Sequence, residues 1–142
     1  MAASSAFFQS GAYAVVGASS TRTKFGNKVL RWYQDAGLKV TPINPKESEI
    51  EGLQVTKTLK ELTNPTTTSI SVITPPAVTL QVLKDAVELD IQHIWLQPGA
   101  EDAAVKEAIA NDSTLSSRTI HSGPCILVLG HQLLSQAKKS NL

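Results

Sequence analysis

The stretch AYAVVGASS, residues 12–20, decides the fold. Its first five residues form a short apolar run, which is typical of a strand buried on both faces of a parallel sheet. Gly17 ends the run, because glycine accepts the tight turn that leads out of such a strand. The three residues that follow are small. The stretch therefore predicts a buried strand at 12–16 followed by a tight loop.

Further segments alternate between helical and strand patterns. Helices are predicted where apolar residues recur at helical spacing, over 27–36, 77–89 and 101–111, with a single turn at 59–62. Short apolar runs predict strands at 38–43, within 50–55, at 69–73, at 93–96 and at 119–121. The run at 126–129 fits a further strand or the start of a terminal helix, because periodicity cannot separate the two over so few residues.

This alternation predicts an α/β fold with right-handed crossovers. We expect a three-layer sandwich, with a mainly parallel sheet and helices on both faces. The chain has 142 residues, so we expect a single domain over 1–142. Residues 1–10 are expected to form a loosely ordered N-terminal extension.

Composition narrows the possible partners. The apolar fraction of 42% and the charged fraction of 18% argue against disorder. A net charge of +1 argues against a nucleic-acid partner, which would call for a strong basic excess. The apolar runs are far shorter than the roughly 18 residues of a membrane span. The single cysteine, Cys125, excludes an intrachain disulfide. We expect a soluble cytoplasmic protein, with the mitochondrion as an alternative, that is a monomer or a small homo-oligomer.

Four predicted strand ends carry turn residues, namely 17–20, 44–46, 74–76 and 97–100. In open α/β sheets, ligands bind outside the carboxyl ends of the strands, at the point where the strand order reverses. All four segments would face that same edge. Together they predict a pocket for a small-molecule nucleotide.

The first of these loops suits a phosphate. Small residues at 18–20 leave backbone N–H groups uncovered, and the hydroxyls of Ser19 and Ser20 add donors. A helix that begins near residues 25–26 would aim the positive end of its dipole at the same place, where Lys24 or Arg22 could also reach. The loop is not a GxGxxG motif, since only Gly17 and Gly26 take comparable roles, so a plain βα turn remains the alternative.

The second loop separates the possible nucleotides. A domain that binds NAD usually places an acid after the second strand, on the ribose hydroxyl. Here that position offers Asn44 and Lys46, and a lysine suits a ribose phosphate. This favours NADP, or a nucleotide with a 3′-phosphate such as coenzyme A, over NAD. A solvated loop lysine is the alternative. Pro75 and Pro76 would either line the pocket as a stiff apolar wall or start the following helix.

Several strings of residues together resemble a known family. They are VGAS at 16–19, KFG at 24–26, PINPK at 42–46, ITPP at 73–76 and WLQPGA at 95–100. In this order they are similar to the small single-domain CoA-binding proteins, which resemble the N-terminal CoA-binding domain of the succinyl-CoA synthetase alpha subunit. The resemblance runs from about residue 12 to about residue 129. It implies a five-stranded parallel Rossmann-like sheet, with coenzyme A or an acyl-CoA as the ligand.

The resemblance also implies roles for the matching positions. The first loop and Lys24 would face the phosphates, residues 44–46 would border the adenosine, residues 74–76 would line the middle of the pocket, and residues 97–100 would lie beyond it. The candidate cofactor-binding residues are Gly17, Ala18, Ser19, Ser20, Lys24, Asn44, Pro45, Lys46, Thr74, Pro75, Pro76, Gln97, Pro98, Gly99 and Ala100. One departure is the stretch SGPC at 122–125, where the family often carries an Arg-Cys pair.

Candidate catalytic groups are few. His121 and Cys125 are four residues apart, and a thiolate beside an imidazole is a nucleophile, so an acyl-CoA-using enzyme with Cys125 as reactive group is one alternative. The apolar residues at 126–128 instead favour a buried cysteine that acts as a small hydrophobe. No histidine or cysteine pair has zinc spacing, so no metal is expected. We expect a module that binds coenzyme A or an acyl-CoA and assign no catalytic residue. An NAD(P)-binding oxidoreductase-like domain is the other alternative.

Overall fold

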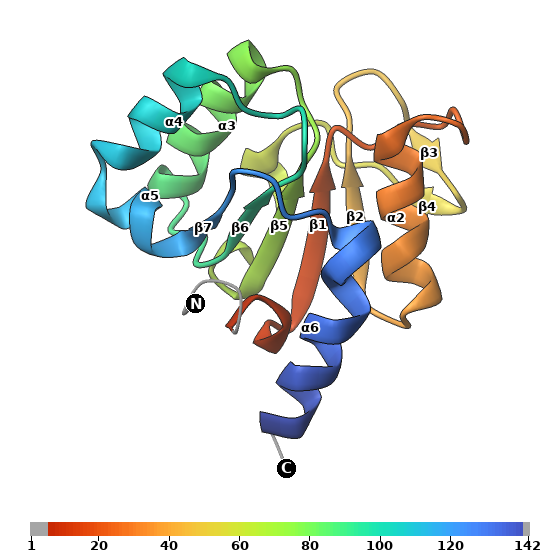
Figure 1. The fold of residues 1–142 in the computed structure, drawn as a ribbon. Coiled ribbons are helices and arrows are strands. Elements are labelled where there is room, and N and C mark those ends of the chain that lie inside the picture. Colours follow the sequence, from red (N-terminus) through yellow and green to blue (C-terminus); the bar gives the residue numbers. More distant parts are fainter. Residues whose placement is uncertain (1–5, 141–142) are drawn as a thin grey trace.

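The computed structural model describes residues 6–140 and is built on a five-stranded sheet (Figure 1). All paired neighbours in it are parallel, in the order β2-β1-β5-β6-β7. The strands are β1 (Ala12–Val16), β2 (Val40–Ile43), β5 (Thr68–Val72), β6 (Ile94–Leu96) and β7 (Thr119–Ile120). The sheet confirms the predicted α/β fold class.

The strand order reverses between β1 and β5. Val16, the last residue of β1, lies opposite Ile43 of β2 on one side and opposite Val72 of β5 on the other. The connection from β1 runs through α2 to β2, and the connection from β5 runs through α3 to β6 on the opposite face of the sheet, which opens a crevice between the carboxyl ends of β1 and β5. This edge is where the sequence predicts the ligand, and Figure 1 shows the three arrowheads side by side there.

Helices cover both faces of the sheet. Figure 1 shows α2 (Phe25–Asp35) and α6 (Ile126–Ser140) on one side, and α3 (Pro76–Glu88), α4 (Ala103–Ala110) and α5 (Ser113–Arg118) on the other. Side chains alternate along a strand, so β1 contributes to two cores. Tyr13 and Val15 pack with α2 and α6, whereas Ala14 and Val16 pack with α3, α4 and α5. The three layers are therefore held by two separate apolar clusters.

The run at 126–129 is the first turn of α6, which settles the alternative that the sequence left open. A stripe of buried residues continues far beyond the run, through Gly130, Leu134 and Ala137. The indole of Trp32, on α2, lies directly against Gly130, where a Cβ would overlap the ring. Gly130 therefore allows α6 to pack closely on α2.

Two segments differ from the sequence expectations. The strand predicted within 50–55 is a separate antiparallel hairpin of β3 (Glu49–Ile50) and β4 (Leu53–Gln54), outside the main sheet. Its turn needs a φ of 49° at Glu51 and of 78° at Gly52. Helix α5 was not predicted. Its N-cap is Asp112, whose carboxylate accepts hydrogen bonds from two backbone N–H groups of the first turn. Short 3-10 helices span Leu59–Glu61 and Pro65–Thr67.

Part of the N-terminal segment, expected to be loosely ordered over residues 1–10, is packed against the sheet. Residues 1–5 lie outside the described residues. Residues 7–9 form a 3-10 helix in which Phe7 is fully buried, with its ring edge-to-face on Trp95 at 5.3 Å between centroids. The Ser69 hydroxyl donates to the Phe7 carbonyl at 2.9 Å. Aromatic burial against the sheet therefore orders this segment.

A polar contact is buried beneath the sheet on the α2 side. The Tyr33 hydroxyl and the Ser71 hydroxyl share a hydrogen bond of 2.7 Å, and burial raises the pKa of Tyr33 well above its usual range. Burial also raises the pKa of Tyr13 to about 12. Both phenols therefore stay neutral, as their apolar surroundings require.

No helix within residues 6–140 is long and apolar enough to cross a membrane.

Candidate functional site

Two glycines set the geometry of the loop after β1. Gly17 has a φ of 95° and lies so close to the Ile73 carbonyl that a Cβ would overlap it. Gly26, in the first turn of α2, lies against the Gly17 carbonyl in the same way. Only glycine permits both approaches. The N-terminus of α2 is therefore held directly over the end of β1, as the sequence predicts for an anion site.

Two buried or half-buried amides turn the peptide groups of this loop. The Asn44 side chain donates to the Ala18 carbonyl at 2.8 Å, and the Asn27 side chain donates to the Ser19 carbonyl, also at 2.8 Å. A peptide N–H points away from the carbonyl of the same unit. Fixing the Ser19 carbonyl therefore turns the Ser20 N–H toward the opposite side, at the surface of the loop. Asn44 thus has a structural task besides the adenosine contact that the resemblance implies.

The exposed side of the loop holds an anion from the chain itself. The Glu47 carboxylate accepts a hydrogen bond from the Ser20 N–H at 2.9 Å, and its other oxygen accepts from the Ser20 hydroxyl. The carboxylate oxygens stand here where two oxygens of a phosphate could stand. The loop is therefore able to bind an oxyanion through one backbone and one side-chain donor.

A second network of hydrogen bonds and an ion pair stabilises the loop through Asn27. The Arg31 guanidinium donates to the side-chain oxygen of Asn27 at 2.6 Å and to the backbone carbonyl of Arg22 at 2.9 Å. The Arg22 guanidinium lies 3.4 Å from the Glu51 carboxylate, which also accepts from Asn27. Arg22 thus contacts the β3–β4 turn through a largely exposed ion pair.

Three lysines lie on the segments that border the site. Lys24 is the N-cap residue of α2 and is exposed, and Lys46 is exposed in the loop after β2. The Lys46 N–H donates to the Asn44 side chain at 2.7 Å, which fixes its backbone while its ammonium group is solvated. Lys57, which the sequence did not single out, donates to the Glu47 carbonyl at 3.2 Å. The local charge suits an anionic ligand although the net charge is only +1.

A cavity of about 220 Å³ adjoins the loop on the α3 side of the sheet. Three predicted site residues, Gly17, Pro45 and Thr74, line it. Its other lining residues come from the ends of β1 and β2, from residues 57–59 and from α3: Val16, Ile43, Lys57, Thr58, Leu59, Val78, Gln81, Val82 and Asp85. The walls are mainly aliphatic and the polar groups lie on Lys57, Thr58, Gln81 and Asp85, so a flat apolar ring with polar edges fits its chemistry.

The segment 74–76 both lines the site and starts α3. The Thr74 hydroxyl shares a hydrogen bond of 2.7 Å with that of Thr79, which holds it beside the cavity. Pro76 is the first residue of α3, and exposed Pro75 is its N-cap. The structure shows one of the two roles foreseen for the prolines, the start of a helix, and neither proline lines this cavity.

The segment 97–100 is divided between core and surface. Gln97 is fully buried, and its side-chain oxygen accepts from the Ile126 N–H at 2.9 Å, which satisfies the first turn of α6. Its Nε2 has no hydrogen-bond partner within residues 6–140. Ala100 is buried as well, whereas Pro98 and Gly99 are exposed. Only the latter two present themselves at the surface.

His121 and Cys125 occupy the loop before α6. The His121 Nδ1 lies 2.7 Å from the hydroxyl of Ser122, its neighbour in sequence. Cys125 is half-buried and its carbonyl accepts from the first turn of α6. The structure thus pairs His121 with Ser122. No group of three or more His, Cys, Asp or Glu side chains that could hold a metal occurs in the described part of the chain.

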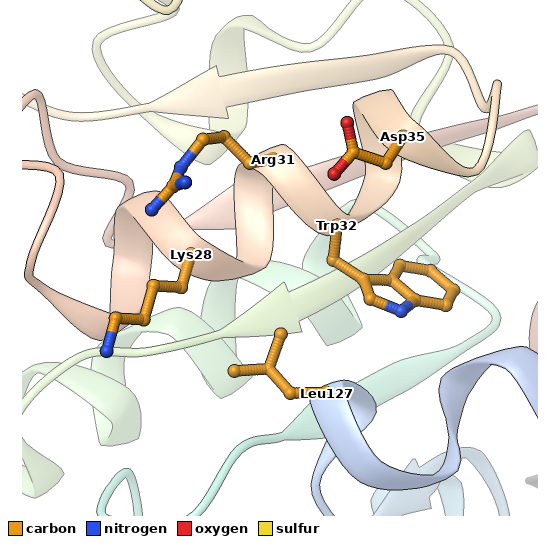
Figure 2. Close-up of a pocket in the computed structure, with 5 residues that line it drawn as sticks. All are labelled: Lys28, Arg31, Trp32, Asp35 and Leu127. Atoms are coloured by element: carbon orange, nitrogen blue, oxygen red, sulfur yellow. The ribbon is translucent and has the colours of Figure 1, made fainter.

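A second hollow, of about 360 Å³, lies between α2 and α6 (Figure 2). Figure 2 shows Lys28 and Arg31 on α2, with Trp32 turning its indole toward α6 and Leu127 projecting from α6. Asp35 completes the lining. None of the predicted site residues lines this groove, which sits on the flank of the sheet and not at its carboxyl edge.

The chain is similar to known proteins over most of its length. Residues 11–131 match a family described as the CoA binding domain. A conserved hypothetical protein from Pyrococcus furiosus is 36% identical, with a TM-score of 0.72 over 82% of this chain and 97% of that one. No curated protein matches the chain.

Two more distant structures share the fold. A protein from Thermus thermophilus is 24% identical, with a TM-score of 0.74 over 90% of this chain and 94% of that one. A hypothetical protein from Pyrococcus horikoshii OT3 is 18% identical, with a TM-score of 0.75 over 91% and 87% of the respective chains.

The Gly26 contact can be tested by Gly26→Ala. Alanine favours a helix over glycine by about 1 kcal/mol, yet its Cβ would overlap the Gly17 carbonyl. We expect a net loss of about 2 kcal/mol in the free energy of unfolding, measured by urea denaturation. The control is Gly11→Ala, where a Cβ meets nothing within 4 Å and the change should stay within about 0.5 kcal/mol. Equal stability of the two variants would refute the close contact.

Proposed function

Because the chain belongs to the CoA binding domain family, we propose that it binds coenzyme A or an acyl-CoA at the carboxyl edge of β1, β2 and β5. The observation that carries the proposal is the pair of hydrogen bonds that Ser20 donates to the Glu47 carboxylate. An oxyanion is held there by a backbone N–H and a hydroxyl, beside a helix N-terminus. These are the groups that bind nucleotide phosphates in folds of this class.

The diphosphate is proposed to lie over residues 17–20. In that position it meets the Ser20 donors, the N-terminus of α2 and the ammonium group of Lys24. The two asparagine amides support this placement, because they fix the loop carbonyls on the inner side before any ligand arrives. Donors that are already oriented lose less conformational freedom on binding, which favours affinity.

The adenine ring is proposed to occupy the cavity of about 220 Å³ beside the loop. Aliphatic walls from β1, β2 and α3 would cover its faces, and Thr58, Gln81 and Asp85 would meet its polar edge. Lys46, exposed at the mouth, would then lie near the ribose and its 3′-phosphate. In this placement the ammonium group of Lys46 would favour coenzyme A over a ligand without that phosphate.

The pantetheine arm is proposed to leave the loop across the ends of β5 and β6. Adjacent strands lie about 4.8 Å apart, so an extended arm crosses several of them. Pro75, Pro98 and Gly99 are exposed along this path, whereas Gln97 and Ala100 are buried. We therefore assign Gln97 a positioning role: it holds the first turn of α6 and contacts the ligand only if that turn moves.

The proposed activity is binding, with no reaction assigned to the chain. The partner is a small nucleotide, and a cytoplasmic location fits the single free thiol of Cys125. NADP is the second candidate ligand, because a lysine after β2 suits its 2′-phosphate as well as the 3′-phosphate of coenzyme A.

The ligand class can be tested by thermal unfolding with added nucleotides. Coenzyme A at about 100 times its Kd should stabilise the protein by about 2.7 kcal/mol, whereas NAD and NADP should not. 3′-Dephospho-coenzyme A should stabilise it less, and Lys46→Ala should remove that difference. Lys139→Ala, at the far end of α6, is the charge-matched control and should keep it. Stabilisation by NADP alone would overturn the proposal, and equal effects of both coenzyme A forms would overturn the role of Lys46.

The placement of adenine can be tested on α3. Val78 is 48% exposed and lines the cavity, whereas Val87, 37% exposed on the same helix, does not. Val78→Trp should fill the cavity and weaken coenzyme A binding by at least about tenfold in isothermal titration calorimetry, because the ring space is lost. Val87→Trp should leave the affinity unchanged. If the two variants bind alike, the adenine lies elsewhere.

A further inference from the structure

Glu47 occupies the same donors that the proposed ligand needs. Its two carboxylate oxygens accept from the Ser20 N–H and the Ser20 hydroxyl. A phosphate that lies over the loop uses those two donors and therefore has to displace the carboxylate. We infer that Glu47 is an internal competitor that lowers the affinity of the loop for every phosphate-bearing ligand, an inference that rests on the proposed function.

The contact is built so that only the side chain has to move. The Glu47 N–H donates to the Asn44 side chain at 3.2 Å, and the Glu47 carbonyl accepts from Lys57 at 3.2 Å. Asn44 in turn holds the Ala18 carbonyl, so the loop after β1 and the loop after β2 keep their positions when the carboxylate leaves. Ser20 is exposed, and rotation of the Glu47 side chain returns its charge to water.

A tethered carboxylate raises the intrinsic affinity that a ligand needs for detectable binding. A group attached 27 residues away but folded against the loop acts at a high effective concentration, so a lone phosphate or pyrophosphate competes poorly with it. A nucleotide carrying a diphosphate gains further contacts in the adjoining cavity and at Lys46, which offset the displacement. Glu47 therefore lowers the affinity of both kinds of ligand by the same factor, and the nucleotide still binds because its further contacts compensate.

The size of the expected change in affinity follows from the fraction of time in which the site is free of the Glu47 carboxylate. When a site is competent for only a fraction of the time, the apparent dissociation constant rises by the inverse of that fraction. The Ser20–Glu47 pair is exposed, and pairs of this kind have modest strength, so we expect a factor of about five. Removal of the carboxylate should recover this factor for coenzyme A and should recover binding of small anions as well.

The test compares four proteins by isothermal titration calorimetry with coenzyme A and with inorganic pyrophosphate. They are the natural chain, Glu47→Gln, Glu47→Ala and the control Glu49→Gln. Glu49 lies two residues further on, exposed in β3, so its replacement removes the same charge from the neighbourhood. Both Glu47 variants should bind coenzyme A about fivefold more tightly and should gain measurable pyrophosphate binding. The control should match the natural chain.

Other outcomes separate this inference from the proposed function. If all four proteins bind coenzyme A equally, Glu47 does not compete, yet the proposed function stands. If the Glu47 variants bind coenzyme A more weakly, the carboxylate supports the bound ligand, which overturns competition. If no protein binds coenzyme A, the proposed function fails together with the inference. Thermal unfolding without ligand verifies that each variant is folded.

Discussion

The contact between the Gly17 carbonyl and Gly26 is the constraint on which the rest of the site depends. It brings the first turn of α2 directly over the end of β1, with no room for a side chain between them. The positive end of the helix, the loop amides and the ends of β2 and β5 then converge at one place. A bulkier residue at either position would separate the helix from the strand, and the donors would no longer point to a common centre.

Two asparagine side chains fix the loop that follows this contact. Asn27 and Asn44 each accept or donate to more than one neighbour, and each ties down one carbonyl of the loop. The loop donors are thereby directed outward without a ligand to hold them. The same amide of Asn44 links the loops after β1 and β2, so these two loops are positioned as one unit.

Much of this architecture could be predicted from local sequence. Strong local patterns mark the strand at 12–16, the glycine turn and the helix that follows. Turn residues likewise mark the ends of the other strands. Helix α6 could not be separated from a strand on four residues, because its identity lies in the spacing of Gly130, Leu134 and Ala137, further along the chain. A longer window would have found it.

Other features have no local signal. Glu47 is an ordinary acid in a polar stretch, and only the fold brings it onto Ser20. Val78, Gln81 and Lys57 come from elements far apart in sequence and meet only at the cavity. Gln97 resembles a surface turn residue in the sequence, yet it is buried because the first turn of α6 needs an acceptor. Such roles depend on which elements pack together, and helical or strand periodicity does not report that.

The central claim is that one edge of the sheet, centred on the loop after β1, binds the nucleotide. A crystal structure of the protein grown with coenzyme A measures this directly. The account predicts diphosphate oxygens within hydrogen-bond distance of the Ser20 N–H, with the adenine between the ends of β1 and β2 and helix α3. Coenzyme A bound in the groove between α2 and α6, or at any place that leaves the loop without a phosphate, would contradict it.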